Sequence, residues 1–388
     1  GVTARVRNTL TDAEETIEAD YMVGTDGGAS TVRETLGIGM SGNPALTYTT
    51  NVVFRCKDFA KLHDKGDGYR FIFIGPEGTW LTIVAIDGRD RFRMSIVGSP
   101  QKITHSEDDI RAALLRAMGK PFDYEIQSVM RWVRRELVAD RYGTKRIFIV
   151  GDAAHLMSPT GAFGMNTGMQ DAADLGWKLA AVLKGWGGPN MIGSYEFERR
   201  QIGDRNVGAS RYATLGRRRW RSMWRPNIRD NTPEGRQSRE ILASVADVEQ
   251  RKTNEMIGAE LGYRYVDSPI ICDIPGGPEH IFRVYEPSTW PGARLPHVWL
   301  NDGSAVQDRL PAFGYTILRL GKTRIDAGPL ERAFASYGAP VKTLDIADDI
   351  AREIYGHDMM VLRPDMHIVW RGNAEPDAAE VAAIATGH

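Results

Sequence analysis

A short apolar strand that ends at an acidic residue is the feature of this chain best suited to chemistry. The pattern predicts the strand over residues 146–150, with Gly151 and Asp152 directly after it. A carboxylate at the carboxyl end of a parallel strand lies where open α/β sheets bind ligands, and it can accept hydrogen bonds from ligand hydroxyl groups. The glycine beside it lets a ligand approach the backbone closely. The pair therefore predicts a ligand-binding edge.

A glycine-rich turn follows the acidic residue and leads into a helix predicted over residues 166–183. The proline at its start stiffens the turn, and the glycines leave its backbone bare. Free peptide N–H groups at the helix start, with about half a positive charge from the helix dipole, can bind the electron-rich edge of a ring. A bare turn of this kind is more often ordinary loop structure. The residues concerned are Pro159, Gly161, Ala162, Gly164, Met165 and Asn166.

A second strand-turn-helix unit lies near the start of the chain. A strand predicted over residues 19–25 leads into Asp26 and Gly27, and Ser30 then caps a short helix through residue 36. Arg33 on that helix could pair with a phosphate or with a structural carboxylate. An Asp-Gly pair at a strand end is usually only a turn, but in tandem with the first motif it indicates a ligand contact.

The two motifs together resemble those of the aromatic-hydroxylase family of flavoprotein monooxygenases (class A), in particular its phenol-hydroxylase-like and aromatic-polyketide-tailoring members. GDAAHLMSPTGAFGMNTGMQDAADLGWKLA looks like the GD motif of that family, and VGTDGGASTVRETLGI looks like its DG motif. PGARLPHVWL and VLRPDMHIVWRG resemble the C-terminal domain of phenol-hydroxylase-type members. The resemblance implies a mixed α/β fold: part of a glutathione-reductase-like FAD-binding domain, an antiparallel substrate-binding sheet and a thioredoxin-like C-terminal domain.

The chain departs from the family pattern at several points. The glycine pair that follows the proline in the family is Gly161 and Ala162 here, which we expect to narrow the turn without abolishing it. An Asn common in the following helix is Asp174. The strand-GxGxxG-helix unit that grips the ADP half of FAD in the family does not precede these motifs. We therefore expect the isoalloxazine half of the site here, with a preceding segment of the same protein missing from this chain.

The resemblance implies a redox cycle without a metal. NADPH or NADH reduces FAD, O2 gives a flavin C4a-hydroperoxide, and its distal oxygen attacks a phenolic or polycyclic aromatic substrate. We assign no catalytic side chain: Pro159 would lie near the reactive flavin edge, and His155, a possible base, is more often structural in such a motif. The residues implied in cofactor binding are Asp26, Gly27, Arg33, Gly151, Asp152, Pro159, Gly161, Ala162, Gly164, Met165 and Asn166.

Two alternative functions stay open. A protein of the same fold could catalyse Baeyer–Villiger insertion, epoxidation or another oxidative tailoring of a natural product, because the residues of the motif are close to those of tailoring members. The chain could also be a flavin-binding or assembly protein without turnover.

The elements that must position these residues follow from the patterning of the rest of the chain. Short alternating runs predict an antiparallel sheet whose last strand ends at Trp132, interrupted by a helix over residues 107–118. Helices are predicted over residues 191–212 and 233–261, a linker over residues 275–278, and a compact α/β module from residue 315. The expected division is 1–45 and 135–212 for the FAD-binding domain, 46–134 for the substrate sheet, 213–278 for a helical connection and 279–388 for the C-terminal domain.

Some aromatic and basic residues have more than one interpretation. Phe71, Phe73 and Trp132 could line the substrate pocket, although core packing is at least as common for such residues. An arginine-rich stretch around Trp220 and Trp224 resembles a nucleic-acid or phospholipid patch, but acidic residues follow it, which favours a solvated helix or a dimer-contact face. Its arginines are Arg217, Arg218, Arg219, Arg221 and Arg225.

Composition narrows the remaining classes. The 388 residues suffice for two or three units, and a net charge of −1 gives no electrostatic footprint for nucleic acid or an anionic membrane. Cys56 and Cys272 are the two cysteines and form no CxxC, so a disulfide framework, a zinc site and thioredoxin-like redox chemistry are not expected. No run approaches the roughly 20 apolar residues that span a bilayer. We expect a cytoplasmic protein, and the sequence leaves open whether it forms a homodimer.

Overall fold

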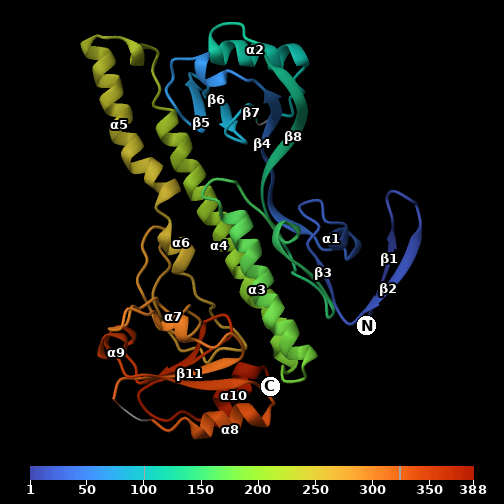
Figure 1. The fold of residues 1–388 in the computed structure, drawn as a ribbon, viewed down its shortest axis with the longest axis vertical. Helices are drawn as coiled ribbons and strands as arrows, with labels where there is room; N and C mark the ends of the chain where they lie inside the picture. Colours follow the sequence, from blue (N-terminus) through green and yellow to red (C-terminus); the bar gives the residue numbers. More distant parts are fainter. Residues whose placement is uncertain (100, 323–324) are drawn as a thin grey trace.

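The computed structural model describes residues 1–99, 101–322 and 325–388 and has a mixed α/β fold (Figure 1). Its described strands form a six-stranded sheet, a four-stranded sheet and two two-stranded sheets. Two long helices, α3 (Phe163–Leu183) and α4 (Pro189–Arg221), run side by side through the middle of the molecule, with the six-stranded sheet at one end and the four-stranded sheet at the other (Figure 1). Within the described part of the chain, no helix has the length and apolar character needed to cross a membrane.

The N-terminal segment forms a hairpin and one half of a parallel strand pair. β1 (Val2–Arg7) pairs antiparallel with β2 (Glu14–Ala19), and β3 (Met22–Gly24) pairs in parallel with β9 (Ile147–Ile149). The strand expected over residues 19–25 is therefore divided between β2 and β3, because the two halves pair with different partners. The short helix capped by Ser30 is confirmed as α1 (Thr31–Thr35), and the parallel strand expected over residues 146–150 is confirmed as β9.

The six-stranded sheet is antiparallel, as expected, but it reaches further than the sequence pattern indicated. Its last long strand continues past Trp132 to Ala139, because this segment pairs with the start of β4 and with β10. Through β10 the sheet is joined directly to the GD motif. The strands, in spatial order, are β10 (His155–Leu156), β8 (Glu125–Ala139), β4 (Met40–Arg55), β7 (Arg91–Ser99), β6 (Gly78–Ala85) and β5 (Arg70–Gly75).

The two faces of this sheet differ in character. One face packs against α2 (Glu107–Met118), the helix predicted at these residues, and each fully buried aliphatic or aromatic side chain there contributes about 1.5–3 kcal/mol. Its core includes Val52, Phe54, Leu81, Ile83, Met94 and Leu114. The opposite face, which we call the polar face, carries Thr49, Asn51, Thr82 and Ser95 in register across neighbouring strands.

The central helices are longer than the patterns predicted, and the next one is broken. α3 begins at Phe163 rather than at residue 166, and α4 extends to Arg221 rather than to residue 212. The helix expected over residues 233–261 is α5 (Pro233–Asn254) followed by α6 (Ile257–Leu261). The break lets Gly258 lie against the carbonyls of Ile281 and Val284, where a Cβ would stand 1.9 Å and 2.2 Å from their oxygens.

An irregular connection leads from α6 to a C-terminal module. The linker expected over residues 275–278 lies within this connection, and the module begins with α7 (Val306–Arg309). Its sheet has the order β12-β11-β13-β14, in which β11 and β12 are parallel and the other neighbours antiparallel. The elements are β11 (Tyr315–Leu320), α8 (Gly328–Ser336), β12 (Val341–Ile346), α9 (Asp349–Tyr355), β13 (Met359–Leu362), β14 (Ile368–Gly372) and α10 (Ala378–Thr386), close to the expected order.

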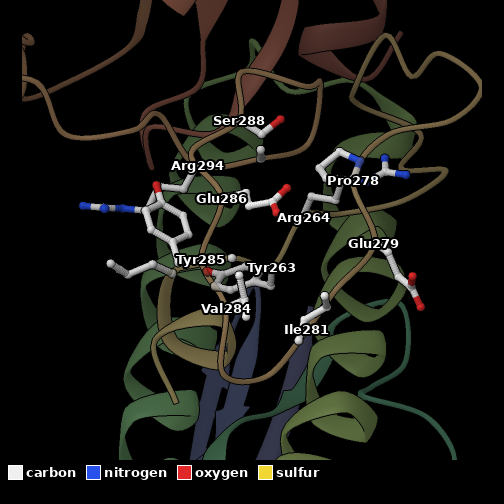
Figure 2. Close-up of a pocket in the computed structure, with 13 residues that line it drawn as sticks. Tyr263, Arg264, Pro278, Glu279, Ile281, Val284, Tyr285, Glu286, Ser288 and Arg294 are labelled. Carbon is white, nitrogen blue, oxygen red and sulfur yellow. The ribbon is translucent and has the colours of Figure 1, made fainter. Parts of the chain in front are cut away.

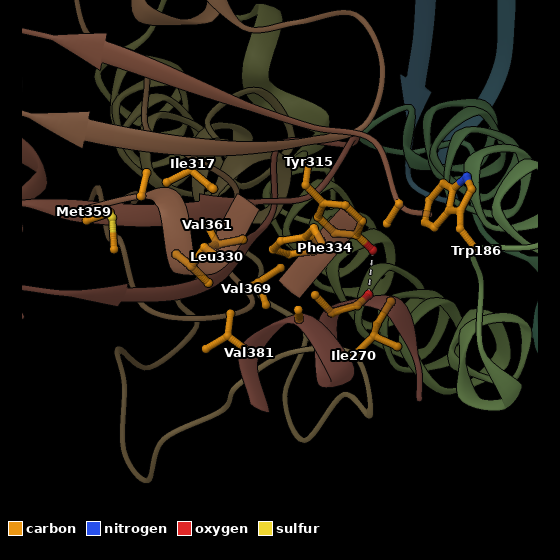
Figure 3. Close-up of a cluster of buried hydrophobic side chains, with 14 of the residues drawn as sticks. Trp186, Ile270, Tyr315, Ile317, Leu330, Phe334, Met359, Val361, Val369 and Val381 are labelled. Atoms are coloured by element: carbon orange, nitrogen blue, oxygen red, sulfur yellow. Dashed lines mark hydrogen bonds between the residues drawn. The ribbon is translucent and has the colours of Figure 1, made fainter. Parts of the chain in front are cut away.

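The core of the C-terminal module includes side chains from outside it (Figure 3). Trp186, from the turn between α3 and α4, and Ile270, from the connection, pack with Tyr315 and Phe334. The Tyr315 hydroxyl donates a hydrogen bond of 2.6 Å to the carbonyl of Ala385 (Figure 3). The module is therefore docked on the central helices through shared core packing.

A buried network of charged side chains also joins the central helices to the C-terminal module. Lys178 of α3 donates to Asp174 at 2.7 Å and to Glu198 of α4 at 2.6 Å. Arg363, which follows β13, donates to the same two carboxylates at 3.2 Å and 2.6 Å and also to Asp365. The side chains of Lys178, Glu198 and Arg363 are 0% exposed. Three structural units therefore share one set of ion pairs.

The two carboxylates at the centre of this network respond differently to their surroundings. Burial raises the pKa of Asp174 to about 7, against the attraction of Lys178. At Glu198 burial is outweighed by Arg363 and Lys178, so the pKa falls to about 2. Glu198 thus stays charged at neutral pH and holds both cations.

Replacing Arg363 with methionine is expected to destabilise the protein by about 3–5 kcal/mol, because the change leaves buried carboxylates without a cation. Arg251→Met is the matched control, since Arg251 pairs only with exposed Asp247 and Glu255 and such pairs contribute about 0–1 kcal/mol. Urea unfolding followed by circular dichroism measures both. Equal losses in the two variants would show that the network does not hold the module.

Asp174 also predicts a pH dependence of stability. Its pKa in the folded protein, about 7, lies above its ordinary value of 3.8, so the folded state keeps a proton that the unfolded state releases in this interval. The free energy of unfolding should therefore fall as the pH rises from 4 to 7, by at most about 1.4 kcal/mol per pH unit from this group. Asp174→Asn should reduce that slope in urea titrations, whereas exposed Asp108→Asn should not. An unchanged slope in Asp174→Asn would contradict the assignment.

Candidate cofactor-binding site

The glycine-rich turn leads into α3, and the start of this helix has no side-chain cap. Ala162, the residue before α3, has a left-handed backbone with φ 61° and ψ 27°. The first-turn N–H groups, including those of Gly164 and Met165, have no acceptor within the helix. The Asn166 amide donates to the Ala162 carbonyl at 2.8 Å and so leaves these N–H groups free. The positive end of α3 is therefore open to a ligand.

Side chains of α4 hold the glycine-rich turn in place from one side. Ser158 and Thr160 are buried, and α4 binds the turn through Ser210, whose hydroxyl donates to the Ser158 carbonyl at 2.8 Å, and Thr214, whose hydroxyl donates to Ser158 Oγ at 2.9 Å. Most of the residues of this motif that the sequence assigned to cofactor binding are exposed, and its three glycines, Gly151, Gly161 and Gly164, are partly buried. The exposed residues are Asp152, Pro159, Ala162, Met165 and Asn166, with Met165 70% exposed.

The strand end that carries Asp152 is fixed against α3 by two glycines and a carboxylate. A Cβ on Gly168 would lie 3.1 Å from the Cα of Gly151, so any side chain at position 168 would push the two backbones apart by a few tenths of an ångström. The N–H of Gly151 donates to Asp171 of α3 at 3.2 Å. This contact sets the distance between Asp152 and the open end of α3.

His155 belongs to the same buried support and not to the ligand surface. Its side chain is 0% exposed, and its Nε2 lies 2.7 Å from Asp171. Arg199 of α4 donates to the other oxygen of Asp171 at 2.8 Å. Burial at Asp171 is outweighed by Arg199 and His155, so the pKa of this carboxyl is lowered. A structural role for His155, the interpretation favoured from the sequence, agrees with this geometry.

The DG motif is ordered by its own carboxylate. Asp26 accepts hydrogen bonds from the Ser30 hydroxyl at 2.5 Å and from the Val32 N–H at 3.0 Å, and these bonds outweigh burial and lower its pKa. Gly27 has φ 82°, and apart from its chain neighbours no described residue has an atom within 4 Å of the position where a Cβ would stand. The backbone at Gly27 is therefore open to a ligand.

Arg33, for which the sequence suggested a phosphate or a structural carboxylate as partner, lies near the Glu34 carboxylate and mainly binds backbone carbonyls. Its guanidinium is buried and donates to the carbonyls of Gly28 at 3.2 Å and Ala153 at 3.1 Å, with Glu34 at 3.9 Å. It therefore ties the DG motif to the GD motif through backbone groups. A direct contact between Arg33 and the cofactor stays a prediction.

The residues brought together fit the riboflavin part of FAD. Open N–H groups at the start of α3 suit the electron-rich edge of an isoalloxazine, and the exposed carboxylate of Asp152 suits the hydroxyl groups of a ribityl chain. The backbone at Gly27 allows the close approach that a flat ring and its side chain require, whereas the Phe163 ring fills the corresponding space at Gly161.

The three aromatic residues considered for the substrate pocket separate onto opposite faces of the six-stranded sheet. Phe71 and Phe73 pack in the core beneath α2, where Phe71 contacts Phe59 and Phe73 contacts Trp80 with ring centroids 5.7 Å and 5.5 Å apart. The structure therefore shows core packing for both. Trp132 pairs with Thr49 on the polar face and is 38% exposed.

A cavity of about 980 Å³ beside the first half of α4 is lined by residues that include Arg141, Lys145, Glu196 and Asp204, none of which was expected to bind the cofactor. A cavity of about 110 Å³ in the connection is lined by residues that include Tyr263, Arg264, Tyr285 and Glu286 (Figure 2), and it is too small for a flavin. In the part of the chain that the structure describes, no group of three or more His, Cys, Asp or Glu residues could hold a metal ion.

Sequence reasoning missed the residues that support the site from behind. Asp171 and Arg199 are separated by 28 residues and no local pattern links them, so only the packing of α3 on α4 pairs them. A GxGxxG string does occur at residues 37–42, but it runs from the loop after α1 into β4, whereas a dinucleotide site needs a strand-to-helix turn. A Cβ on Gly42 would lie 2.2 Å from the Glu136 carbonyl oxygen, so that glycine serves sheet packing.

Ala162→Gly is expected to stabilise the protein by about 1 kcal/mol, because a left-handed backbone is strained for alanine and not for glycine. Ala112→Gly in the exposed part of α2 is the control and should destabilise by about 1 kcal/mol, since a helical backbone gains nothing from glycine. Thermal unfolding of both variants measures the difference. A lower melting temperature for Ala162→Gly would contradict the strain at this turn.

Comparisons with known proteins agree with this geometry. Residues 1–210 match the family model described as FAD binding domain, and residues 288–387 match that described as aromatic-ring hydroxylase, C-terminal. An FAD-dependent monooxygenase of Penicillium oxalicum is 31% identical over all of this chain and 78% of its own length. The chain spans between 51% and 78% of the lengths of the first three curated relatives.

Solved structures show the same architecture. The rebeccamycin biosynthetic enzyme RebC with reduced flavin matches with a TM-score of 0.86 at 29% identity, over 99% of this chain and 71% of that one. A ternary complex of aklavinone-11 hydroxylase with FAD and aklavinone matches with a TM-score of 0.78 at 27% identity, over 99% and 70%. The chain therefore belongs to the FAD-binding family of flavoprotein aromatic-ring monooxygenases.

Proposed function

We propose that this protein is an NAD(P)H-dependent flavoprotein monooxygenase that hydroxylates a phenolic or polycyclic aromatic substrate. The observation that carries the proposal is the uncapped start of α3, held open beside the exposed Asp152 and next to the sheet that β10 joins to the GD motif. When bound, FAD would accept electrons from NADPH or NADH and would then activate O2.

The backbone at the start of α3 supplies the electrostatic part of the reaction. Fixed N–H groups and the positive helix end stabilise negative charge on a bound ring without needing to reorganise. The N–H groups of Gly164 and Met165 would meet the charged edge, and Asp152 would bind hydroxyl groups of the side chain. Ser158 and its contacts to α4 keep this geometry fixed.

The six-stranded sheet supplies the place for the aromatic substrate. Its polar face lies on the side away from α2 and offers hydroxyl and amide groups, such as those of Asn51 and Ser95, that can bind a phenol. Trp132 on the same face can pack against an aromatic ring. Because an electrophilic oxygen attacks electron-rich rings, a ring that already carries a hydroxyl group is the expected substrate.

Turnover of the full-length protein tests the function. We expect NADPH or NADH consumption to rise with added phenols and the amount of hydroxylated product to match the nucleotide oxidised. Ester or epoxide products would support the other oxidative reactions of this fold and contradict hydroxylation. Peroxide release without any oxygenated product would contradict the monooxygenase assignment.

Asp152→Ala is expected to weaken FAD binding by about tenfold to a hundredfold, because a hydrogen bond to a charged group contributes about 1.5–3 kcal/mol. Glu375→Ala, an exposed carboxylate in the C-terminal module, is the control and should leave the affinity unchanged. Titration of the flavin-free protein, followed by quenching of flavin fluorescence, gives both dissociation constants. Equal affinities in the two variants would remove Asp152 from the site.

A further inference from the structure

Among the described residues, four arginines near the polar face of the six-stranded sheet form no hydrogen bond or ion pair with a carboxylate. Arg70 lies in β5, Arg134 in β8, and Arg217 and Arg221 in the last turns of α4. Within the described residues none of these guanidinium groups has a hydrogen bond or ion pair, and Nε of Arg134, Arg217 and Arg221 is buried without a partner. Buried donors without acceptors are uncommon in folded proteins and indicate a missing partner.

The strand register places the two sheet arginines on the polar face. Arg70 pairs with Val84, which continues across the sheet to Arg93 and Val53, and side chains directly opposite share one face. Val53 alternates with Val52 and Phe54 of the α2 core, so this row faces away from α2. On β8, Arg134 alternates with Val133 and therefore lies on the same face as Trp132.

The helix arginines face the sheet because of their spacing. Arg217 and Arg221 are four residues apart and lie on one side of α4, which packs against β8 and β6. In Figure 1 this end of α4 reaches the sheet on the side away from α2. Both arginines are partly buried, whereas Arg218 and Arg219 between them are exposed.

The carboxylates near this cluster are already paired with other cations. Glu136 of β8 accepts from Arg211 at 2.7 Å, and Glu249 of α5 pairs with Arg219 at 3.4 Å and Lys252 at 2.8 Å. The arginine-rich stretch of α4 is thus divided by its periodicity. One side forms ordinary ion pairs, and the other side presents free guanidinium groups to the sheet.

The pKa values of Arg217 and Arg221 also indicate a missing anion. Burial, and then the charges of Arg70 and Arg134, lower the pKa of Arg217 to about 10. Burial, followed by Arg217, Arg70 and Arg134, lowers the pKa of Arg221 to about 9. Both groups remain charged at neutral pH and repel one another, so an anion bound between them would remove an unfavourable interaction.

We propose that Arg217 and Arg221, supported by the positive charge of Arg70 and Arg134, bind a carboxylate group of the aromatic substrate, which makes this protein selective for acidic aromatic compounds. The inference rests on the proposed function, since it names the substrate class of that site. Guanidinium groups bind carboxylates through paired hydrogen bonds, which fix orientation as well as add affinity. The carboxylate end of the substrate would lie under α4, and its ring would lie along the polar face beside Trp132.

Equilibrium dialysis with two probes of the same ring system tests the proposal without turnover. The probes are 3-hydroxy-2-naphthoate and uncharged 2-naphthol, and the protein is the full-length FAD-loaded enzyme. We expect wild type to bind the naphthoate more tightly than the naphthol. Arg217→Gln and Arg221→Gln should each weaken naphthoate binding by about tenfold or more while changing naphthol binding by less than about twofold.

The control is Arg236→Gln, an exposed arginine of α5 that changes the net charge equally and should leave both affinities as in wild type. Equal affinity of wild type for the two probes would overturn the proposal, as would equal losses for both probes in the variants. The cluster would instead be a nucleotide phosphate site if the variants raised the KM for NADPH but not for NADH and left naphthoate binding unchanged.

The outcomes separate this inference from the function on which it rests. Hydroxylation of naphthol without preference for naphthoate would support the monooxygenase and refute the arginine site. Arginine-dependent naphthoate binding, with nucleotide consumption that no phenol stimulates, would support the site and refute the proposed reaction.

Discussion

The buried charges between α3, α4 and the C-terminal module are the constraint on which the rest of the structure depends. Glu198 of α4 holds Lys178 of α3 and Arg363 of the module at once, so neither helix can shift without exposing or unpairing a charge. Breaking a buried pair is costly, even though forming one adds little net stability. The network therefore fixes position more than it adds free energy.

The same two helices carry the cofactor site, and this connection gives the network its functional meaning. Asp171, one helical turn before Asp174, receives Arg199 from α4 and His155 from the GD motif. The open start of α3 and the exposed Asp152 are thus positioned by a support that runs without interruption into the C-terminal module. The C-terminal module is thus joined to the support of the candidate cofactor site by packing and ion pairs.

The six-stranded sheet is organised by the contrast between its faces. The apolar face packs against α2. The polar face lies beside α4, and any ligand bound to the sheet would lie between them. The long strand β8 pairs with β4 and also reaches β10 within the GD motif. Arg217 and Arg221 stand where α4 meets that face, which is why a stretch that looked like a solvated helix surface gains a binding role in our proposal.

The sequence by itself determined the motifs and the local structure around them. Glycine, proline and acidic residues at fixed spacing predicted the turn before α3, and alternation predicted the antiparallel strands, because both signals depend on neighbours in the chain. Only the tertiary structure decided which residues share a sheet face and which residues of distant segments contact one another. It placed Phe71 in the core and Trp132 on the polar face, turned Arg33 onto backbone carbonyls, and paired Asp171 with Arg199. Those outcomes depend on strand register and helix packing between distant segments, which no local pattern encodes.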